Sequence, residues 1–262
     1  MSARNHWALP QFSLRFSQVW RRNLLVWRKL AIPSMLGNLA DPLLYMFGLG
    51  YGLGRMLEDV NGMSYIGFLA AGIICSSTMM SASFEAMYSA FSRMQMQKTW
   101  EAILNAPLTL DDVVLGEMIW GASKSFLSGC AVLVVAAVLG LVPSPLALAV
   151  IPVIFLTGLA FAALGLIMTA LSPSYDFFMY YFTLCVTPMM LLCGVFFPLD
   201  QLPAAAQVAA QLLPLTHAVS LARPLVNGEV PATWPLHIAV LAVYAIAAFY
   251  VALALTRRRL LK

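Results

Sequence analysis

Residues 146–171 read LALAVIPVIFLTGLAFAALGLIMTAL, and this stretch contains no Asp, Glu, Lys or Arg. A helix needs about 20 apolar residues to cross the roughly 30 Å hydrocarbon core of a bilayer, so the stretch predicts a membrane-spanning helix. On either side of it, comparable apolar runs predict five more spans, at residues 32–53, 65–87, 113–142, 177–197 and 234–255. We therefore expect an all-α membrane protein with six transmembrane helices.

The composition agrees with a lipid environment. Hydrophobic residues make up 61% of the 262 residues and charged residues only 10%, and the mean hydropathy is +0.85. A soluble domain carries about a quarter charged residues, because its surface faces water. The net charge of +4 comes from Lys and Arg gathered near the two ends of the chain, as orientation signals would be. We expect no nucleic-acid partner, and the four cysteines, which lie in apolar runs without metal-ligand spacing, predict no metal site.

Basic residues are distributed unevenly between the two sides of the six spans. Lys and Arg precede the first span, follow the last and occur between the second and third, whereas the opposite loops hold only Arg55 and Arg223. By the positive-inside rule, both termini are cytoplasmic. Residues 1–31 would form a cytoplasmic N-terminus with an amphipathic helix at the membrane interface, or alternatively a soluble helix packed on a partner. Residues 32–262 would form a single transmembrane domain.

Two loops stand out. In the cytoplasmic loop 91–112, the sequence SRMQMQKTWEAILNAP predicts a short helix ended by Pro107. This loop is either the surface for a cytoplasmic partner or a plain connector. On the opposite side, residues 198–231 are rich in proline, and residues 203–213 can form one short helix that dips into or lies on the outer interface rather than spanning the membrane.

Ionisable side chains are costly inside a membrane, so each needs a partner or a water-filled neighbour. Five occur in or beside the predicted spans: Asp41, Glu85, Glu117, Lys124 and, at a cytoplasmic end, Asp176. Glu117 and Lys124 are seven residues apart on one helix face, and Lys124 can reach back toward Glu117. Glu85 lies at a similar depth, so the three can share a polar cluster if their helices adjoin. Such a pair either stabilises the bundle, contacts an anionic substrate or gates its passage.

Aromatic residues open the fifth predicted span, Tyr180 and Tyr181 among them. Clusters of this kind commonly form an interfacial belt. Their flat rings also stack on sugars, which would suit a pathway for a glycan or a lipid.

Sequence motifs for catalysis are lacking. The chain contains no GxxxxGK[ST] nucleotide loop, no HExxH and no GxSxG, and its three histidines are scattered. We therefore expect a protein that is not an enzyme, has no catalytic residues and cannot hydrolyse ATP by itself.

Four long stretches carry a family resemblance. KTWEAILNAPLTLDDVVLGEMIWGASKS, LSPSYDFFMYYFTLCVTPMMLLCGVFFPLDQLP, LLPLTHAVSLARP and DPLLYMFGLGYGLG resemble the NodJ family of ABC type-2 transporter permeases, so the likeness covers nearly the whole chain. It implies a six-helix type V exporter fold in the bacterial cytoplasmic (inner) membrane. The family's outer re-entrant helical hairpin, between spans five and six, corresponds to residues 199–226. Its cytoplasmic coupling helix corresponds to residues 98–107, with Lys98, Thr99, Trp100, Glu101 and Asn105 as contacts to an ATPase.

The same resemblance implies the partners and the cargo. The permease would form a homodimer and bind two copies of a NodI-like ABC ATPase, which would hold ATP and Mg, while this chain would hold no cofactor. The cargo would be a lipid-linked or amphiphilic oligosaccharide, such as a Nod-factor-like lipooligosaccharide. Candidates for its pathway or gate are the five charged residues above with Tyr180 and Tyr181.

Three other functions stay open at this point. The chain could be an ATP-independent secondary carrier or channel, although such proteins usually show internal repeats and several midplane charges. It could be an ABC type-2 exporter of a drug or of another lipid. It could also be a membrane-embedded enzyme acting on lipid, for which Glu85 with Glu117 would be the only acid–base pair.

Overall fold

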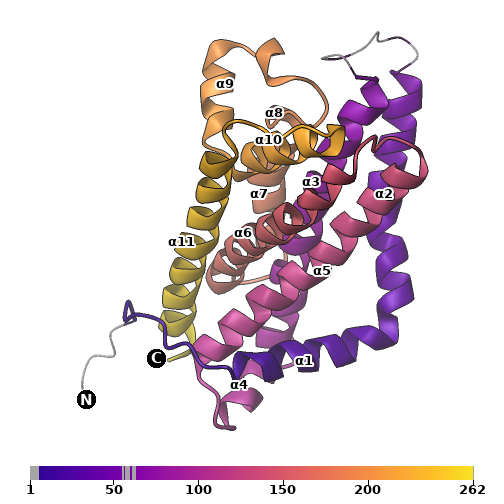
Figure 1. Cartoon of the computed structure of the whole chain (residues 1–262). Helices are drawn as coiled ribbons and strands as arrows, with labels where there is room; N and C mark the ends of the chain where they lie inside the picture. Colours follow the sequence, from indigo (N-terminus) through magenta and orange to yellow (C-terminus); the bar gives the residue numbers. More distant parts are fainter. Residues whose placement is uncertain (1–5, 55, 57–59, 61–62, 262) are drawn as a thin grey trace.

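Helices account for the regular structure of the protein. The computed structural model describes residues 6–54, 56, 60 and 63–261, and within them there is no β-strand, only an isolated bridge between Val60 and Met63. Figure 1 shows inclined helices forming a bundle, with α1 lying across one end and α9 and α10 at the other. The predicted all-α fold class is confirmed.

The elements follow one another in a simple order. The first half contains α1 (Phe16–Trp27), a 3-10 turn (Arg28–Leu30), α2 (Ala31–Gly52), α3 (Tyr65–Phe84), two π-helical segments (Glu85–Ser89 and Ser92–Met96), α4 (Thr99–Leu104) and α5 (Leu110–Val138). The second half contains a 3-10 turn (Pro145–Ala149), α6 (Val150–Leu171), α7 (Phe177–Tyr181), a π-helical segment (Phe182–Val186), α8 (Thr187–Leu192), a 3-10 turn (Leu199–Gln201), α9 (Ala204–Gln211), α10 (Pro214–Asn227) and α11 (Trp234–Leu260).

Within the described residues, four helical stretches are long and apolar enough to span a membrane: Tyr65–Met96, Leu110–Val138, Pro145–Leu171 and Trp234–Leu260. They coincide with four of the six predicted spans. α2 coincides with the first predicted span and has 22 residues, but Asn38 and Asp41 make it less apolar. The fifth predicted span is the shorter apolar stretch Phe177–Leu192. All six predicted segments are therefore helical, and the count of six spans stays a prediction.

Several predicted boundaries were wrong, for local reasons. The third predicted span ends at Val138 instead of residue 142, and the fifth ends at Leu192 instead of residue 197. Each helix end is followed by a glycine with positive φ, Gly140 at +74° and Gly194 at +75°, a conformation that ends a helix readily. The second predicted span ends too early at residue 87, because the helix continues through two π-helical segments into what was expected to be a loop.

The proline-rich segment also differs from the prediction in its helices. The one short helix expected at residues 203–213 is present as α9, but a second helix, α10, follows it. Pro214 begins α10, where a residue without a backbone N–H is tolerated because that donor would have no partner inside the helix. Two helices therefore stand where the family resemblance implied a hairpin.

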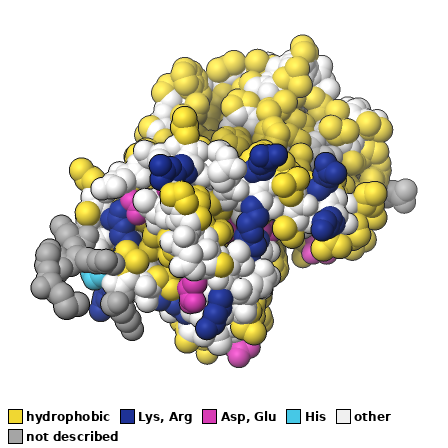
Figure 2. Space-filling model, turned by 90° about the horizontal axis from the view of Figure 1, so that it is seen from below, with side chains coloured by type: hydrophobic (Ala, Val, Ile, Leu, Met, Phe, Trp, Pro, Cys, Tyr) yellow, Lys and Arg dark blue, Asp and Glu magenta, His cyan; other side chains and the backbone are white. Residues whose placement is uncertain are grey.

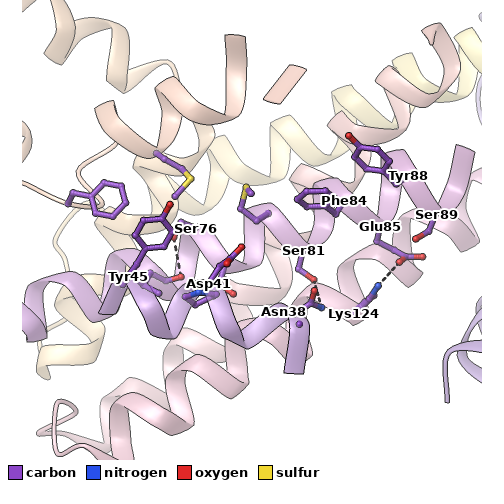
Figure 3. Close-up of a pocket in the computed structure, with 17 residues that line it drawn as sticks. Asn38, Asp41, Tyr45, Ser76, Ser81, Phe84, Glu85, Tyr88, Ser89 and Lys124 are labelled. Atoms are coloured by element: carbon purple, nitrogen blue, oxygen red, sulfur yellow. Dashed lines mark hydrogen bonds and ion pairs between the residues drawn. The ribbon is translucent and has the colours of Figure 1, made fainter. Parts of the chain in front are cut away.

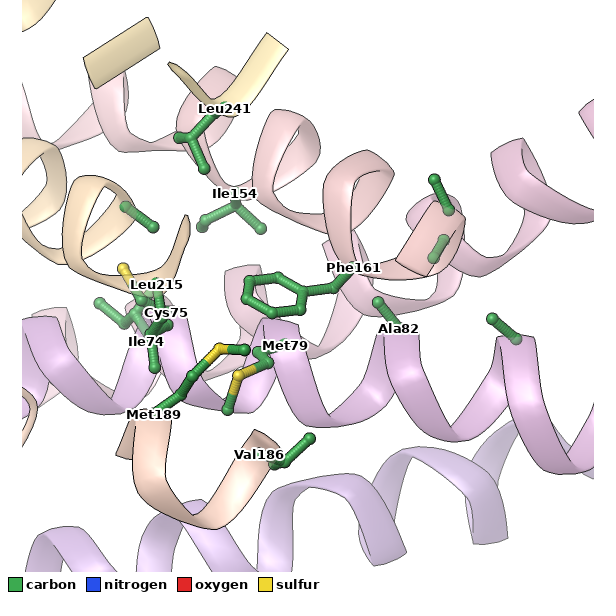
Figure 4. Close-up of a cluster of buried hydrophobic side chains, with 14 of the residues drawn as sticks. Ile74, Cys75, Met79, Ala82, Ile154, Phe161, Val186, Met189, Leu215 and Leu241 are labelled. Carbon is green, nitrogen blue, oxygen red and sulfur yellow. The ribbon is translucent and has the colours of Figure 1, made fainter. Parts of the chain in front are cut away.

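α3 is the centre of the bundle. In its most apolar window 89% of the residues are buried, against 39% for α11, so α3 is surrounded by protein while α11 lies at the periphery. Figure 4 shows apolar side chains converging beside α3, with Phe161 of α6 between Met79 and Ile154. Small residues allow this close approach: a Cβ added to Gly129 of α5 would overlap the side chains of Thr78 and Ile154.

The bundle has two ends, which we name after the short helices α4 and α9. The α4 end is formed by α1, the two π-helical segments that follow α3, α4, the part of α5 up to Glu117 and the last turn of α11. The α9 end is formed by α9, α10 and the first turn of α11. At the α4 end, a capping box starts α5: the Thr109 side chain accepts a hydrogen bond from the Asp112 backbone, and the Asp112 carboxylate accepts one from the Thr109 backbone.

Candidate functional site

Two carboxylates from different helices share one arginine. Arg93 donates from Nη2 to Oε1 of Glu85 at 2.9 Å, and its Nε lies 3.0 Å from Oε1 of Glu117. A third bond joins Arg93 Nη2 to Glu117 Oε2 at 2.5 Å. Glu85 and Glu117 are only 3% and 1% exposed, so water cannot replace these bonds. The predicted polar cluster of Glu85 and Glu117 is present, and Arg93 holds it together.

Lys124 completes this cluster in a way that differs from the prediction. Its ammonium donates to Oε2 of Glu85 at 2.8 Å, so the expected pairing of Lys124 with Glu117 was wrong. The indole of Trp120 donates to Oε1 of the same carboxylate at 2.7 Å. We call Glu85, Arg93, Glu117 and Lys124 the charge network; its two carboxylates and two cations balance in formal charge.

The charge network reaches α4 through one side chain. Trp100 is 1% exposed, and its indole donates to Oε1 of Glu117 at 3.1 Å. The other predicted coupling residues lie differently: Lys98, Glu101 and Asn105 are exposed, and Thr99 is half-buried and accepts a long bond from Arg22 at 3.4 Å. Of the five predicted coupling residues in and beside α4, three are exposed and Trp100 points to the interior.

Helix geometry explains why these residues meet. Glu117, Trp120 and Lys124 follow one another at spacings of three and four, which places them on one face of α5. Glu85 and Arg93 are eight residues apart, and in a straight α-helix their side chains would point about 80° apart. The wider π turn at Glu85–Ser89 adds a residue between them and brings both to the face that meets α5.

Electrostatics around the network extend to α1. Burial lowers the pKa of Arg22, and this effect is partly offset by the negative charge of Glu117 and reinforced by Arg93. The ring of Trp27, at the end of α1, also packs edge-on against Trp120 at a centroid distance of 6.0 Å. The N-terminal helix therefore lies beside the charge network.

A cavity of about 430 Å³ lies beside the charge network, between α2, α3, α5 and α8. Figure 3 shows its polar side chains projecting from α2 and α3, with Lys124 bonded to Glu85 at one end and Tyr45 at the other. We call it the α2–α3 cavity. Its lining combines hydroxyl, amide and charged groups with aromatic rings: Asn38, Asp41, Tyr45, Ser76, Ser77, Ser81, Phe84, Glu85, Tyr88, Ser89, Lys124 and Phe196, together with Gly37, Pro42, Ile73, Met80 and Met190.

Three of the seven predicted pathway residues line this cavity, and four do not. Asp41, Glu85 and Lys124 are among its walls. Asp176 and Tyr180 are exposed elsewhere, and Tyr181 is buried in the packing of α7. The aromatic contribution comes instead from Tyr45, Phe84, Tyr88 and Phe196. Glu117 does not line the cavity, and Arg93 joins it to Glu85 in the cavity wall.

Sequence reasoning missed several of these residues. Arg93 was taken for an orientation signal in a loop, although it lies in a helical extension of α3 and reaches two buried carboxylates. The serines at positions 77, 81 and 89 were not recognised either. Ser77 and Ser81 are four residues apart, which places their hydroxyls on one helix face, and this is the signal that could have identified a polar wall.

A second buried ion pair lies at the α4 end, away from the cavity. Arg257 of α11 binds Asp111 of α5 through Nε at 3.1 Å and through Nη2 at 2.5 Å. Arg257 also donates to the backbone carbonyl of Ala8, and Gln11 donates its backbone N–H to Asp111 at 2.8 Å. This pair fastens residues 6–15 across the ends of α5 and α11.

The α9 end has a different chemistry. Arg223 of α10 donates to the carbonyl of Gly194 at 2.5 Å and lies 3.6 Å from the ring centre of Phe68. Among the described residues it forms no ion pair, its Nε has no hydrogen-bond partner, and burial lowers its pKa to about 10. His217 and His237 join α10 to α11, with their Nδ1 atoms 2.8 Å apart.

No group of three or more His, Cys, Asp or Glu side chains suited to a metal ion occurs in the described part of the chain. The four cysteines are not in disulfides, and Cys75 and Cys193 are buried. Both carboxylates of the charge network are paired with cations, Glu117 with Arg93 and Glu85 with Arg93 and Lys124, so neither is presented as a free acid or base.

The sequence has clear relatives. Residues 15–226 match the ABC-2 type transporter family. The chain is 52% identical to Nodulation protein J of Rhizobium leguminosarum bv. viciae over 97% of this chain and 98% of that protein. It is 50% identical to Nodulation protein J of Rhizobium meliloti (strain 1021) over 97% of each chain. A more distant likeness, at 25% identity over 77% of this chain and 78% of the other, joins it to the inner membrane transport permease YadH of Escherichia coli (strain K12).

Proposed function

Because the chain belongs to the ABC-2 type transporter family, among the Nodulation protein J permeases, we propose that it exports an amphiphilic, lipid-linked oligosaccharide. In this proposal it has six spans, crosses the bacterial cytoplasmic (inner) membrane and keeps both termini in the cytoplasm. It acts as a homodimer with two copies of a NodI-like ATPase, which binds ATP and Mg. Permeases of this family pair with an ATPase subunit, and this chain has no nucleotide loop of its own.

The α2–α3 cavity is the observation that carries the proposed cargo. Hydroxyl and amide groups, such as those of Ser77 and Asn38, can bond to sugar hydroxyls, and tyrosine rings can stack on sugar faces. Phe84, Phe196 and Met190 supply apolar surface for an acyl chain in the same space. A purely apolar drug or lipid would cover the exposed Asp41 of the cavity wall without offering its carboxylate a hydrogen bond, which is unfavourable.

The surface of the α4 end supports the proposed orientation and the docking of an ATPase. Figure 2 shows this end, where Lys and Arg side chains are spread over the face with fewer Asp and Glu between them. The positive-inside rule assigns such a face to the cytoplasm. On α4, the exposed Lys98, Glu101 and Asn105 are the side chains available to a partner, while Trp100 points inward.

The outward face of α2 supports a second copy. Asp41 and Tyr45 lie in the middle of this helix, line the cavity and are still solvent-accessible in the single chain. A carboxylate facing lipid would cost several kcal/mol by insertion scales, about 2.5–3.5 at a helix centre. Another protein surface or a polar cargo must therefore cover this face. A homodimer across α2 would supply that protein surface and place the cavity at the interface, where the cargo would bind.

The proposal is tested with proteoliposomes that contain the chain and its co-expressed ATPase. The probe is chitotetraose with a fatty acyl chain on one terminal amine and a fluorophore at the reducing end. ATP should drive this probe into vesicles whose ATPase faces outward, and omitting the ATPase should abolish uptake. Uptake driven by an ion gradient without the ATPase would establish the secondary-carrier alternative. ATP-driven movement of phospholipid or dye, but not of the probe, would establish an exporter with another cargo.

A matched pair of variants locates the pathway. Tyr45 and Tyr180 are both exposed, at 46% and 64%, but only Tyr45 lines the cavity. Tyr45→Ala should lower probe uptake at least five-fold, and Tyr180→Ala should leave it within two-fold of the parent. The reverse order would place the cargo on α7, as the aromatic start of the fifth predicted span first suggested.

A further inference from the structure

Resting on the proposed function, we infer that Arg93 is the positioning residue through which movement of α4 controls whether Lys124 is paired with Glu85 or free to bind cargo in the α2–α3 cavity.

A continuous chain of polar bonds joins the two places. The indole of Trp100 on α4 bonds to Glu117 at 3.1 Å, and Glu117 is held by Arg93 at 3.0 Å from Nε. Arg93 bonds in turn to Oε1 of Glu85 at 2.9 Å, and Oε2 of Glu85 holds Lys124 at 2.8 Å. No step exceeds hydrogen-bond length, so the route contains no gap for water to fill.

Because these residues are buried, a displacement at one end of the chain of bonds is passed on to the next residue. Trp100 and Glu117 are each 1% exposed, and Glu85 is 3% exposed. If α4 shifts, Glu117 must either follow the indole or lose it, and water does not compensate for a lost bond in a buried site. A displacement of Glu117 therefore acts directly on Arg93, whose guanidinium is its ionic partner.

Arg93 then determines the state of Lys124, because two cations compete for one carboxylate. Glu85 is shared between Arg93 and Lys124, while Glu117 binds Arg93 alone among the cations. When Arg93 moves away from Glu117, its guanidinium can bind Glu85 in a bidentate way, with two parallel N–H···O bonds, as arginine prefers. Lys124 is then displaced, and its side chain, which is 18% exposed and lines the cavity, becomes available to the cargo.

The backbone around Arg93 can accommodate such a change. Glu85 and Arg93 lie in π-helical segments, whose hydrogen bonds can shift register toward an α-helix. Between the second of these segments and α4, Lys98 has a φ of +50°, the only positive value of a non-glycine residue in the described chain. The connection from Arg93 to α4 is therefore built of unusual backbone, which is typical of segments that move.

The test compares two buried arginines in the complex of the chain with its ATPase. Arg93→Lys keeps the charge but replaces the planar guanidinium with one ammonium nitrogen, so it cannot reproduce the contacts that Nε and Nη2 make with the two carboxylates. Arg257→Lys makes the same change in the other buried ion pair, which touches neither α4 nor the cavity. Probe uptake and ATP hydrolysis are measured together. For Arg93→Lys, the ATP consumed for each exported probe should rise at least ten-fold, and for Arg257→Lys it should stay within two-fold.

A second measurement does not depend on the identity of the cargo. The four native cysteines are replaced by alanine, Ser89 in the cavity wall is changed to cysteine, and its reaction rate with a water-soluble maleimide is followed. Trapping the ATPase with ATP and vanadate should change this rate at least three-fold in the parent, but less than 1.5-fold with Arg93→Lys.

These results separate the inference from the proposed function. If the parent complex moves no probe while the labelling still responds to ATP and depends on Arg93, the proposed cargo fails and the inference stands. If Arg93→Lys and Arg257→Lys change the ATP cost equally, or if labelling responds to ATP equally with and without Arg93, the network only stabilises the fold and the inference is wrong.

Discussion

The α4 end and the α9 end are held together by different chemistry. At the α4 end, buried arginines meet carboxylates: Arg93 binds Glu85 and Glu117, and Arg257 binds Asp111. At the α9 end, Arg223 binds only backbone carbonyls. Breaking a buried ion pair costs about 3–5 kcal/mol, because it leaves an uncompensated charge, whereas a hydrogen bond from a charged group to a carbonyl contributes about 1.5–3 kcal/mol, before the cost of burying that charge.

This difference indicates that the α4 end behaves as a unit and the α9 end does not. At the α4 end, a change at one residue leaves a charge on another helix without its partner, so the elements move together or not at all. At the α9 end, each contact can be lost separately at small cost. Such an arrangement suits an α4 end that moves as a rigid body and an α9 end whose surface opens easily.

The largest expected effect tests the α4 end. Arg93→Met keeps much of the side-chain length but leaves two buried carboxylates without their shared cation. The free energy of unfolding should fall by about 3–5 kcal/mol. Denaturation in mixed micelles with increasing SDS, followed by tryptophan fluorescence, measures this change. A loss below about 1 kcal/mol would show that the carboxylates find other partners.

The same substitution at the α9 end should matter much less. Arg223 has no carboxylate partner among the described residues, and Met can retain a contact with the ring of Phe68. Arg223→Met should change the free energy of unfolding by about 1 kcal/mol, because the loss of a hydrogen bond from a charged group, about 1.5–3 kcal/mol, is partly offset by no longer burying that charge. Equal losses for Arg93→Met and Arg223→Met would remove the contrast between the two ends.

A double-mutant cycle asks whether the α4 end is coupled over several residues. Trp100→Phe and Lys124→Met remove the first and last links of the network without touching each other. Their effects on the free energy of unfolding should be non-additive by about 0.5–2 kcal/mol, since both act on one hydrogen-bond network. In the control cycle, Arg223→Met is combined with Tyr244→Phe, which removes the hydrogen bond from the Tyr244 hydroxyl to the carbonyl of Leu212 near the α9 end. This cycle should be additive within about 0.5 kcal/mol. Additivity in both cycles would mean that the network is a set of independent bonds.

The smallest expected effect concerns the backbone before α4. Lys98→Gly relieves the left-handed conformation, which costs a non-glycine residue about 1–2 kcal/mol, but glycine adds about 0.5–1 kcal/mol of entropy loss. The net change should be a stabilisation of about 0.5–1 kcal/mol in the same SDS titration. The neighbouring Gln97 has a φ of −85°, so Gln97→Gly should destabilise instead. Stabilisation by both variants would indicate that the whole connection is strained.

Much of the fold could be predicted from the sequence, because lipid imposes a simple rule on helix length and polarity. The runs at residues 65–87, 146–171 and 234–255 each became a long helix, and the short helix before Pro107 is α4. The exact ends could not be predicted, since they depend on backbone conformations such as the positive φ of Gly194. The π turns after Phe84 leave no obvious mark in the sequence either.

The candidate site was predicted only in part, for a similar reason. Asp41, Glu85 and Lys124 were selected as costly charges, and they do line one cavity. Which charge pairs with which depends on how α3 and α5 are rotated against each other, and spacing along α5 alone favoured Glu117 for Lys124. Trp100 was expected to contact a partner, yet it is buried, because helical spacing does not reveal which face of a six-residue helix turns inward.

The two faces of α4 have a consequence for how such transporters can diversify. The side chains at positions 98, 101 and 105 are exposed to a partner. They are separate from the indole of Trp100, which bonds to Glu117 in the interior. If the proposed function holds, substitutions on the first face would adapt the permease to a different ATPase without altering the bond between Trp100 and Glu117. A chimaera that exchanges only those three positions should change its preferred motor while retaining its cargo.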